Sequence, residues 1–144
     1  MLQKKIMTTI FGYRNLNVYK KAFQLLIQIN KLIKRFPADE KDSLTDQIRR
    51  SSRSVAANIV EAYKKRVYPK DFARVLRISD SEASETVFWL EVACACEYIT
   101  PEELTKYEDE YVEVGKMLGR MIENPEKFKP FPSSRTEEIK RKSN

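Results

Sequence analysis

The sequence predicts an all-α protein, folded as an antiparallel up-down-up-down four-helix bundle. Six prolines, at positions 37, 69, 101, 125, 130 and 132, lie outside the periodic apolar stretches and divide the chain into four helical segments. Only three glycines occur, and no Asn-Gly or Asp-Gly turn and no long apolar-polar alternation supports a sheet. Because the connections between the segments are short, consecutive helices should run antiparallel.

Length and composition predict one domain. A chain of 144 residues has room for one core, and its 42% of hydrophobic residues is too high for a disordered chain. We expect an extended N-terminal segment over residues 1–14, the bundle over 15–124, and an irregular C-terminal arm with a mobile tail over 125–144. No apolar run reaches the roughly 18 residues of a membrane span, and the N-terminus is too polar for a secretory leader. We therefore expect a cytoplasmic protein without membrane association.

The first helical segment, from about Leu16 to Phe36, has a wider apolar surface than one bundle core requires. One row of residues alternates at spacings of three and four, as in a bundle seam: Tyr19, Ala22, Leu26, Ile29, Ile33 and Phe36. Further apolar residues widen this surface: Val18, Phe23, Leu25, Ile27 and Leu32. We therefore expect a second buried contact on this helix, beyond the core of the single bundle.

The second segment begins near Ser43 and ends before Pro69. Ser43, with Asp46 three residues later, forms a capping-box-like pattern in which an Asp replaces the usual Glu or Gln. The segment is rich in small residues that let a neighbouring helix approach closely: Ser51, Ser52, Ser54, Ala56 and Ala57. We expect this helix to be the most tightly packed of the four.

The third and fourth segments begin at Pro69 and Pro101. The third runs to about Tyr98, and its core-facing positions alternate at spacings of four and three: Phe72, Leu76, Ser79, Ala83, Thr86, Leu90 and Ala93. The fourth has Thr100 as its N-cap, proline at its first position and two glutamates in its first turn, where the helix dipole favours anions. It should end near Glu123.

The residue types that carry most enzyme chemistry are scarce. The sequence contains no histidine, which removes the commonest general base, the usual zinc ligand and every Ser/His or Cys/His nucleophile. Cys94 and Cys96 are two residues apart on a helix and point to different sides, so we interpret them as small buried apolar residues. Carboxylate pairs such as Glu82 and Glu85 lack the histidines of di-iron bundles. We expect no catalytic residue, no metal and no cofactor.

Positive charge is concentrated in the first half of the chain. Residues 1–36 contain eight Lys or Arg and no Asp or Glu, whereas residues 100–124 contain three basic and seven acidic residues. This surplus is larger than solubility requires and favours a surface that binds nucleic-acid phosphates. The candidate binding residues are Arg14, Lys20, Lys21, Arg49, Arg50, Arg53, Lys64, Lys65 and Arg66. The alternative is a solvated cationic face.

A polar stripe on the second segment has two interpretations. Its members are spaced by one helical turn: Arg50, Ser54, Asn58, Glu61 and Lys65. In the structural interpretation, Ser54, Asn58, Glu61 and Glu85 of the third segment form a polar seam, with an arginine bonded to both glutamates to fix the helix register. In the functional interpretation the stripe is a binding surface. We favour the structural one for Asn58 and Glu61.

Six motifs are spread along the chain: YRNLNVY at residues 13–19, LTDQIRRSS at 44–52, SVAANIVEAY at 54–63, FARVL at 72–76, SETVFWL at 84–90 and GKML at 115–118. Together they resemble those of a known family, the four-helix-bundle proteins encoded by intervening sequences of bacterial 23S rRNA genes, also labelled S23 ribosomal. The resemblance covers about Tyr13 to Met121. This chain departs from the family at Val60 and Ala62, where small residues including a glycine are common, and residues 125–144 resemble an extension.

The resemblance implies a four-helix bundle that assembles into a ring-like homopentamer and associates with nucleic acid. Similar bundles are accessory proteins of retroelements and bind nucleic acid and a reverse transcriptase. Two functions therefore remain open from the sequence. The first is a non-enzymatic, oligomeric protein that binds the backbone of RNA or DNA through the first two helices. The second is an interaction scaffold that docks an acidic protein partner.

Overall fold

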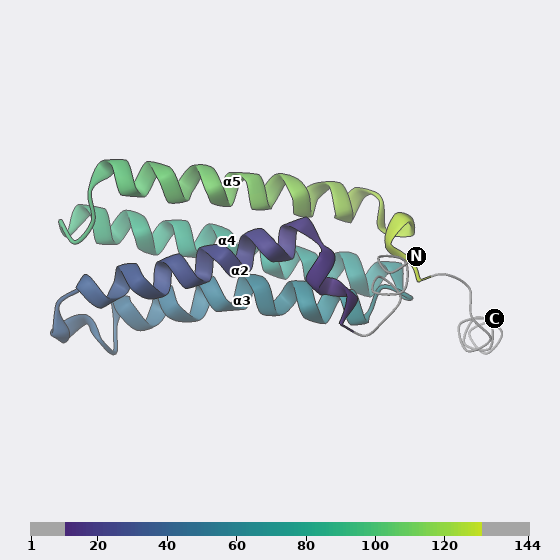
Figure 1. Cartoon of the computed structure of the whole chain (residues 1–144), viewed down its shortest axis with the longest axis horizontal. Coiled ribbons are helices and arrows are strands. Elements are labelled where there is room, and N and C mark those ends of the chain that lie inside the picture. Colours follow the sequence, from purple (N-terminus) through teal and green to yellow (C-terminus); the bar gives the residue numbers. More distant parts are fainter. Residues whose placement is uncertain (1–10, 131–144) are drawn as a thin grey trace.

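Four long helices lie side by side, and consecutive helices run in opposite directions (Figure 1). The computed structural model describes residues 11–130, and within these residues all the regular secondary structure is helical. The long helices are α2 (Asn17–Leu32), α3 (Leu44–Lys64), α4 (Pro69–Ala95) and α5 (Pro101–Glu123). Short 3-10 turns are η1 (Gly12–Asn15), η2 (Ile33–Arg35), η3 (Ala38–Glu40) and η4 (Pro125–Phe128). The all-α four-helix fold is as predicted.

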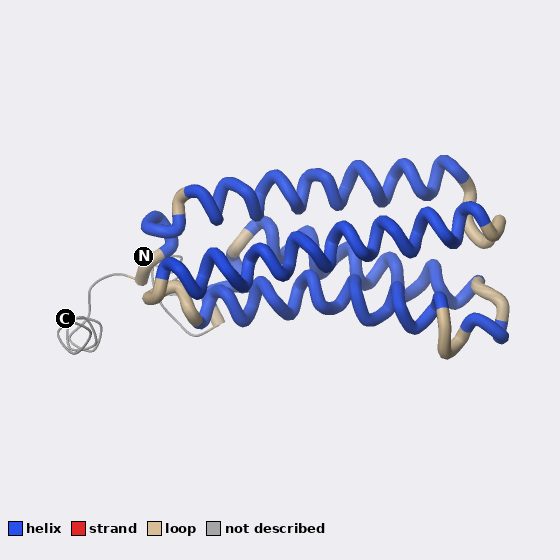
Figure 2. Tube along the Cα trace, turned by 180° about the vertical axis from the view of Figure 1, so that it is seen from behind, coloured by secondary structure: helices blue, strands red, loops and turns tan. Residues whose placement is uncertain are grey.

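The four helices are arranged in a square, in the order of the sequence. Helix α3 packs against α2 and α4, and α5 packs against α4 and α2. The connections lie at the two ends of the bundle, so the long sides are formed by helices alone (Figure 2). As a result, α2 and α3 share one edge of the bundle, and α4 and α5 share the opposite edge.

The buried row of α4 matches the prediction. All seven predicted core positions, from Phe72 to Ala93, are buried. Helix α4 contacts α3 most extensively, and small side chains permit this contact. The buried hydroxyl of Ser79 donates a 2.7 Å hydrogen bond to the carbonyl oxygen of Val55, and the hydroxyls of Thr86 and Ser51 are hydrogen-bonded at 2.8 Å.

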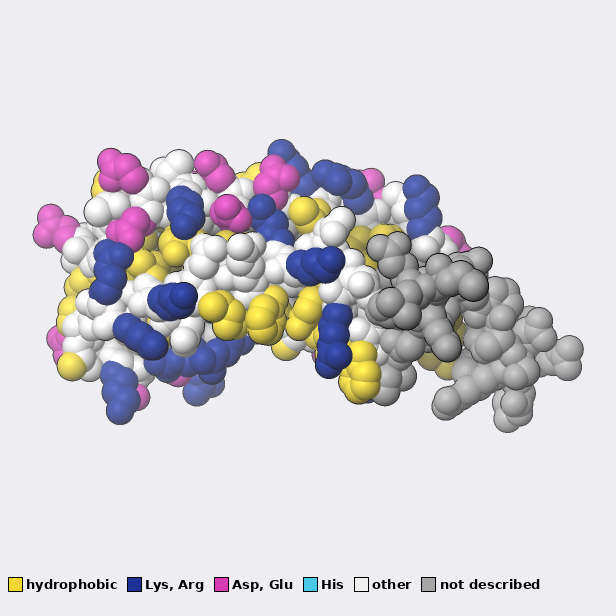
Figure 3. All heavy atoms as spheres, viewed as in Figure 1, with side chains coloured by type: hydrophobic (Ala, Val, Ile, Leu, Met, Phe, Trp, Pro, Cys, Tyr) yellow, Lys and Arg dark blue, Asp and Glu magenta, His cyan; other side chains and the backbone are white. Residues whose placement is uncertain are grey.

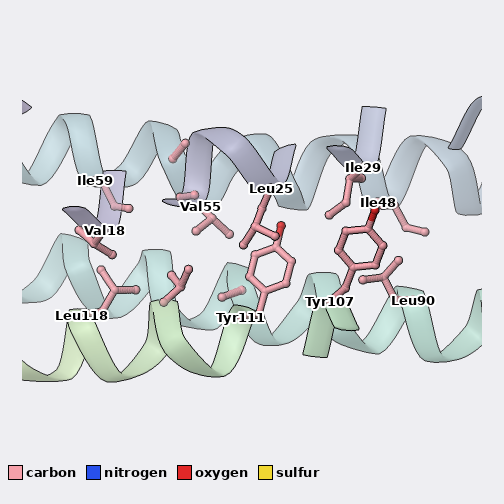
Figure 4. Packing of buried hydrophobic residues seen from close by; sticks show 14 of the residues in the cluster. Val18, Leu25, Ile29, Ile48, Val55, Ile59, Leu90, Tyr107, Tyr111 and Leu118 are labelled. Atoms are coloured by element: carbon pink, nitrogen blue, oxygen red, sulfur yellow. The ribbon is translucent and has the colours of Figure 1, made fainter. Parts of the chain in front are cut away.

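The prediction for the core row of the first segment is correct at four of its six positions, Ala22, Ile29, Ile33 and Phe36, and wrong at the other two. The buried row on this helix is Val18, Ala22, Leu25, Ile29 and Leu32. Figure 4 shows Leu25 beside Tyr111 and Ile29 beside Tyr107, both tyrosines coming from α5. Tyr19 and Leu26, which we assigned to the seam, are only partly buried. Both rows have helical periodicity, so spacing cannot choose between them, and the contacts with α3 and α5 set the rotation of α2.

The start of α5 is capped as predicted and is also linked to the end of α2. Thr100 Oγ1 accepts a hydrogen bond from the backbone N–H of Glu103, and Glu103 Oε1 accepts one from the backbone N–H of Thr100. The Arg35 guanidinium donates to both oxygens of the Glu103 carboxylate, at 2.6 and 3.0 Å. These bonds lower the pKa of the Glu103 carboxyl to about 2, and the hydrogen bond from Arg35 makes the largest contribution.

Three local predictions need correction. Gly12–Asn15 forms a 3-10 turn instead of extended chain, and α2 ends at Leu32, where its last turn tightens into the 3-10 turn Ile33–Arg35. The Ser43 side chain makes no capping bond, because the Ser43 backbone (φ −123°, ψ −107°) is not in the extended conformation of a capping residue, and the Asp46 carboxylate pairs with Arg49 and Arg50 instead.

The described part of the C-terminal arm packs on the bundle. Phe128 in η4 stacks on the buried Phe72 of α4, with ring centroids 5.7 Å apart. The rest of the predicted arm and tail, residues 131–144, and residues 1–10 of the predicted N-terminal segment lie outside the described residues. None of the helices between residues 11 and 130 is sufficiently long and apolar to span a membrane.

The capping box predicts a pH-dependent stability. Because the pKa of Glu103 falls from 4.5 to about 2 on folding, its charge stabilises the fold above about pH 4.5, and this contribution is lost as the pH falls towards 2. Thr100→Ala should lower the free energy of unfolding by about 1 kcal/mol. Glu103→Gln should be less stable than wild type at pH 7, with the difference shrinking between pH 4.5 and 2. Urea unfolding across this pH range measures both effects, with Thr105→Ala on the exposed side of α5 as control.

The small-residue contact between α3 and α4 predicts intolerance to larger side chains. Ser79→Leu places a larger side chain where the Ser79 hydroxyl meets the backbone of Val55 in α3, and should lower the free energy of unfolding by about 1 to 3 kcal/mol. Ser81→Leu, the same change at an exposed position of α4, should cost less than about 0.5 kcal/mol. Equal decreases for the two variants would contradict a close packing of α3 on α4. Urea denaturation measures both.

Candidate nucleic-acid interface

Three of the predicted cations are exposed and unpaired. Lys20 on α2 and Arg53 and Lys64 on α3 form no ion pair with any other residue between positions 11 and 130. Arg53 and Lys64 are eleven residues apart, about three helical turns or 16 Å, so they point to the same side of α3. We call these three residues the basic face. Arg14 extends it at one end, where its guanidinium lies 4.8 Å from the ring centre of the half-exposed Phe11.

Four further predicted cations are paired with carboxylates. Lys21 reaches across to Glu110 of α5, with Nζ and Oε2 3.2 Å apart, and so links two helices. Three others pair along their own helix, which leaves them less available to phosphates: Arg49 and Arg50, which share Asp46 at 3.4 and 2.7 Å, and Lys65, which lies 3.2 Å from Glu61. The sequence prediction treated all the candidate cations as equivalent. In the structure, some are exposed without an ion pair among residues 11–130 and others are paired with carboxylates.

Arg66 is a structural residue. Only 9% of its surface is exposed, its guanidinium lies 3.8 Å from the ring centre of Tyr63, and its Nη1 donates a 2.9 Å hydrogen bond to the Tyr63 carbonyl oxygen. Burial lowers the pKa of the Arg66 guanidinium and also raises the pKa of the Tyr63 hydroxyl. Arg66 therefore closes the C-terminus of α3, where the helix dipole favours a cation, and cannot offer its charge to a phosphate.

The predicted polar seam does not connect helices. Asn58 Nδ2 donates to the carbonyl and hydroxyl oxygens of Ser54, at 2.8 and 3.0 Å, within α3. Glu61 pairs with Lys65 on the same helix, and Glu85 accepts a 3.3 Å hydrogen bond from Trp89 within α4. The bonds described for these residues therefore run along single helices. Glu61 and Glu85 are both exposed, so neither requires a buried arginine.

An exposed apolar stripe runs beside the basic face. Its members are Tyr19, Phe23, Leu26 and Ile27. Phe23 is 47% and Ile27 41% exposed, whereas Tyr19 and Leu26 are partly buried and pack against the edge of the core. Tyr13 packs edge-on against both Tyr19 and Tyr63, which places this side of α2 next to α3. In Figure 3 a hydrophobic band with Lys and Arg side chains around it crosses this face. Of the surplus apolar residues that the sequence singled out on the first segment, Phe23 and Ile27 lie on this surface, whereas Val18, Leu25 and Leu32 are buried.

A groove lies between α4 and α5. It has a volume of about 510 Å³ and is lined by Asp80, Ala83, Ser84, Val87, Glu108, Tyr111, Val112, Gly115 and Lys116. Val112 is 49% exposed. A Cβ on Gly115 would lie 3.3 Å from Asp80 Oδ1, so the absence of a side chain at this position keeps the groove open. We call this feature the acidic groove, because Asp80 and Glu108 face a single lysine.

The described residues offer little that would hold a metal. Between residues 11 and 130, no three His, Cys, Asp or Glu side chains gather as a metal site requires. Burial, with the neighbouring charge of Glu85, raises the pKa of Glu82. Cys96 is exposed just after α4, contrary to our prediction of a buried residue, and both cysteines are free.

Comparison with known proteins identifies the family. Residues 14–120 match the family model described as 23S rRNA-intervening sequence protein. The chain belongs to this family. The match agrees with the predicted resemblance and ends before η4. A 1.70 Å crystal structure of a protein of unknown function from the S23 ribosomal protein family of Bacteroides thetaiotaomicron is similar to this 23S rRNA-intervening sequence protein. The two are 34% identical with a TM-score of 0.67, over 74% of this chain and 95% of the other. No curated protein matches.

The placement of Arg66 predicts that it affects stability instead of binding. Arg66→Ala should lower the free energy of unfolding by about 1 to 2 kcal/mol, because it removes a partly buried cation–π contact and a carbonyl bond. Its effect on the salt dependence of oligonucleotide binding should be negligible. A reduced salt slope with unchanged stability would show that Arg66 contacts phosphate. Urea unfolding and fluorescence anisotropy with a labelled RNA give the two readouts.

Proposed function

We propose that this protein is a non-enzymatic, self-associating bundle that binds the backbone of RNA or DNA through its basic face. The observation that carries the proposal is that Lys20, Arg53 and Lys64 are exposed on adjacent helices without an acidic partner among residues 11–130. Helix α2 contains no acidic residue at all. The acidic residues are concentrated in α5, which lies on the opposite edge from α3.

The geometry suits phosphates more than bases. The cations are spread over about 16 Å of α3, which is several times the spacing of phosphates along a strand. No compact recognition motif accompanies them, so binding should be strong at low salt and weakly dependent on sequence. The family description mentions an intervening sequence of 23S rRNA, which fits a nucleic-acid partner and does not specify a ligand.

The second candidate function is a protein interaction scaffold. The half-exposed Phe23 and Ile27 favour it, since phosphate binding requires no apolar stripe. In that function the basic face would steer an acidic partner onto the stripe. Reversing the charges at Arg49, Arg53 and Lys64 separates the two, because a scaffold would lose its protein complex while RNA binding stayed intact.

Salt dependence of binding tests the primary function. The triple variant Lys20→Ala, Arg53→Ala, Lys64→Ala should bind oligonucleotides more weakly, and the slope of log K against log salt should fall by about 0.7 to 0.9 for each phosphate that the variant no longer neutralises. The matched control removes three exposed cations from α4 and α5 that form no ion pair within residues 11–130: Arg77→Ala, Lys106→Ala, Arg120→Ala. It should retain most of the slope.

Two outcomes would exclude the proposal. One is a shallow or absent salt dependence of wild-type binding for RNA and DNA alike. The other is an equal decrease of the slope in the control variant, which would show that net charge acts without the basic face. The mass of each variant in solution is measured in the same buffers, so that a change in assembly is not mistaken for a change in binding.

A further inference from the structure

A pocket with a volume of about 300 Å³ lies at the end of the bundle where α2 begins and α5 ends. Its lining comes from three parts of the fold: residues 15–18 around the start of α2, one side of α5, and Phe128 of η4. Figure 1 shows the start of α2, the end of α5 and the turn η4 at the same end of the molecule. The pocket contains no residue of the basic face, the apolar stripe or the acidic groove, so it is a separate feature.

Most of the pocket wall is apolar. Leu16 and Val18, around the start of α2, are buried, and Met117 and Met121 lie one turn apart on α5. Phe128 closes the pocket from η4 and is held by its ring stack on α4. Unbranched thioether side chains adapt to irregular apolar shapes. Small-molecule pockets have volumes of about 300 to 1,000 Å³ and mostly apolar walls, so this one is large enough for a single small ligand.

Two polar side chains of the lining are hydrogen-bond donors without partners. The exposed Arg120 guanidinium forms no ion pair with any residue between positions 11 and 130. Asn15 Nδ2 is buried and also has no hydrogen-bond partner in that range. An unpaired buried amide is costly to the folded state. Because no hydrogen bond holds this amide, it can turn towards the pocket without breaking one. A guanidinium has only donors, so both groups require an acceptor on the ligand.

We propose that this pocket binds a small monocarboxylate with an apolar body. The one unpaired guanidinium matches the single negative charge of a carboxylate, whereas a phosphate monoester carries a charge of about −1.5 to −2 at neutral pH. Arginine also pairs with both oxygens of a carboxylate at once. The apolar body lies against the two methionines and Phe128, and the carboxylate lies at Arg120, within reach of the Asn15 amide.

The pocket depends on residues beyond the family match. That match covers residues 14–120, and Met121 and Phe128 follow it. The wall that closes the pocket is therefore formed by a part of this chain that the family model does not describe. The inference is also independent of the proposed function, because Lys20, Arg53 and Lys64 take no part in the pocket. A protein without oligonucleotide binding would leave it unaffected.

A ligand series with one apolar chain and three head groups tests the inference on the full-length wild type. The probe is octanoate, used below its micelle concentration, and octanol and octylamine carry the same chain with a neutral and a cationic head. In isothermal titration calorimetry, octanol should bind about tenfold more weakly than octanoate, because a hydrogen bond to a charged group is lost. Octylamine should not bind, since its ammonium would face two donors.

The methionines locate the ligand. The chain contains four methionines, two of which line the pocket. In NMR spectra of methyl-labelled protein, the signals of Met117 and Met121, assigned with Met→Leu variants, should shift as octanoate is added and should saturate with the calorimetric affinity.

Two variants each change one donor at little cost in volume. Arg120→Gln removes the charge, and Asn15→Asp replaces the amide donor with a carboxylate that repels the ligand head. Each should weaken octanoate binding by about tenfold or more. The matched control is Arg77→Gln, which removes an exposed arginine of α4 outside the pocket and should bind octanoate as wild type does. If circular dichroism shows that a variant is unfolded, the ligand series on the wild type decides the question.

Four results would overturn the inference. The first is an affinity for octanol or octylamine equal to that for octanoate, since the pocket would then not recognise the carboxylate. The second is octanoate binding that neither folded variant weakens, and the third is the absence of any octanoate-dependent shift at Met117 and Met121. The fourth is a shift of these two signals with protein concentration alone, which would make a second chain the occupant of the pocket.

Discussion

The close contact between α3 and α4 determines the rotation of α3 and, through it, the surface of the molecule. The small side chains of Ser51 and Ser79 bring the two helices together, and buried hydroxyl bonds at Ser79 and Thr86 fix the pairing. Larger side chains would separate the helices, whereas unpaired hydroxyls would be costly in the core. With α3 held in this rotation, Arg53 and Lys64 point outward beside α2.

A second constraint follows from the surplus of apolar residues on α2. A helix in a four-helix bundle buries one face, and α2 has two apolar rows. The row of Leu25 and Ile29 enters the core, which leaves Phe23 and Ile27 half in water. Burying a large apolar side chain contributes about 1.5 to 3 kcal/mol. Because Phe23 and Ile27 are each about half exposed, covering both would contribute about as much as burying one such side chain completely.

The distribution of charge follows from which helices are neighbours. Helix α2 meets α5 on one side, and there Lys21 and Arg35 pair with Glu110 and Glu103. On its other side α2 meets α3, which has few acidic residues, so Lys20 and Arg53 stay unpaired within residues 11–130. The same cations in the sequence thus become either links between helices or a basic face. Exposed ion pairs of this kind contribute little to the stability of the fold. They matter more for binding, because a cation that is paired with a carboxylate is less available to a phosphate.

The sequence by itself determined the elements and the family. Prolines at 69 and 101 and the cap at Thr100 act over one or two turns, so they specify helix ends wherever the helix later packs. The α4 row from Phe72 to Ala93 was also readable, because its alternating spacing of four and three continues without interruption along the helix. Only the tertiary structure decided which row of α2 is buried, which cations are paired, and that Arg66 is buried. These depend on the rotation of each helix against its neighbours, and periodicity within one helix contains no information about that rotation.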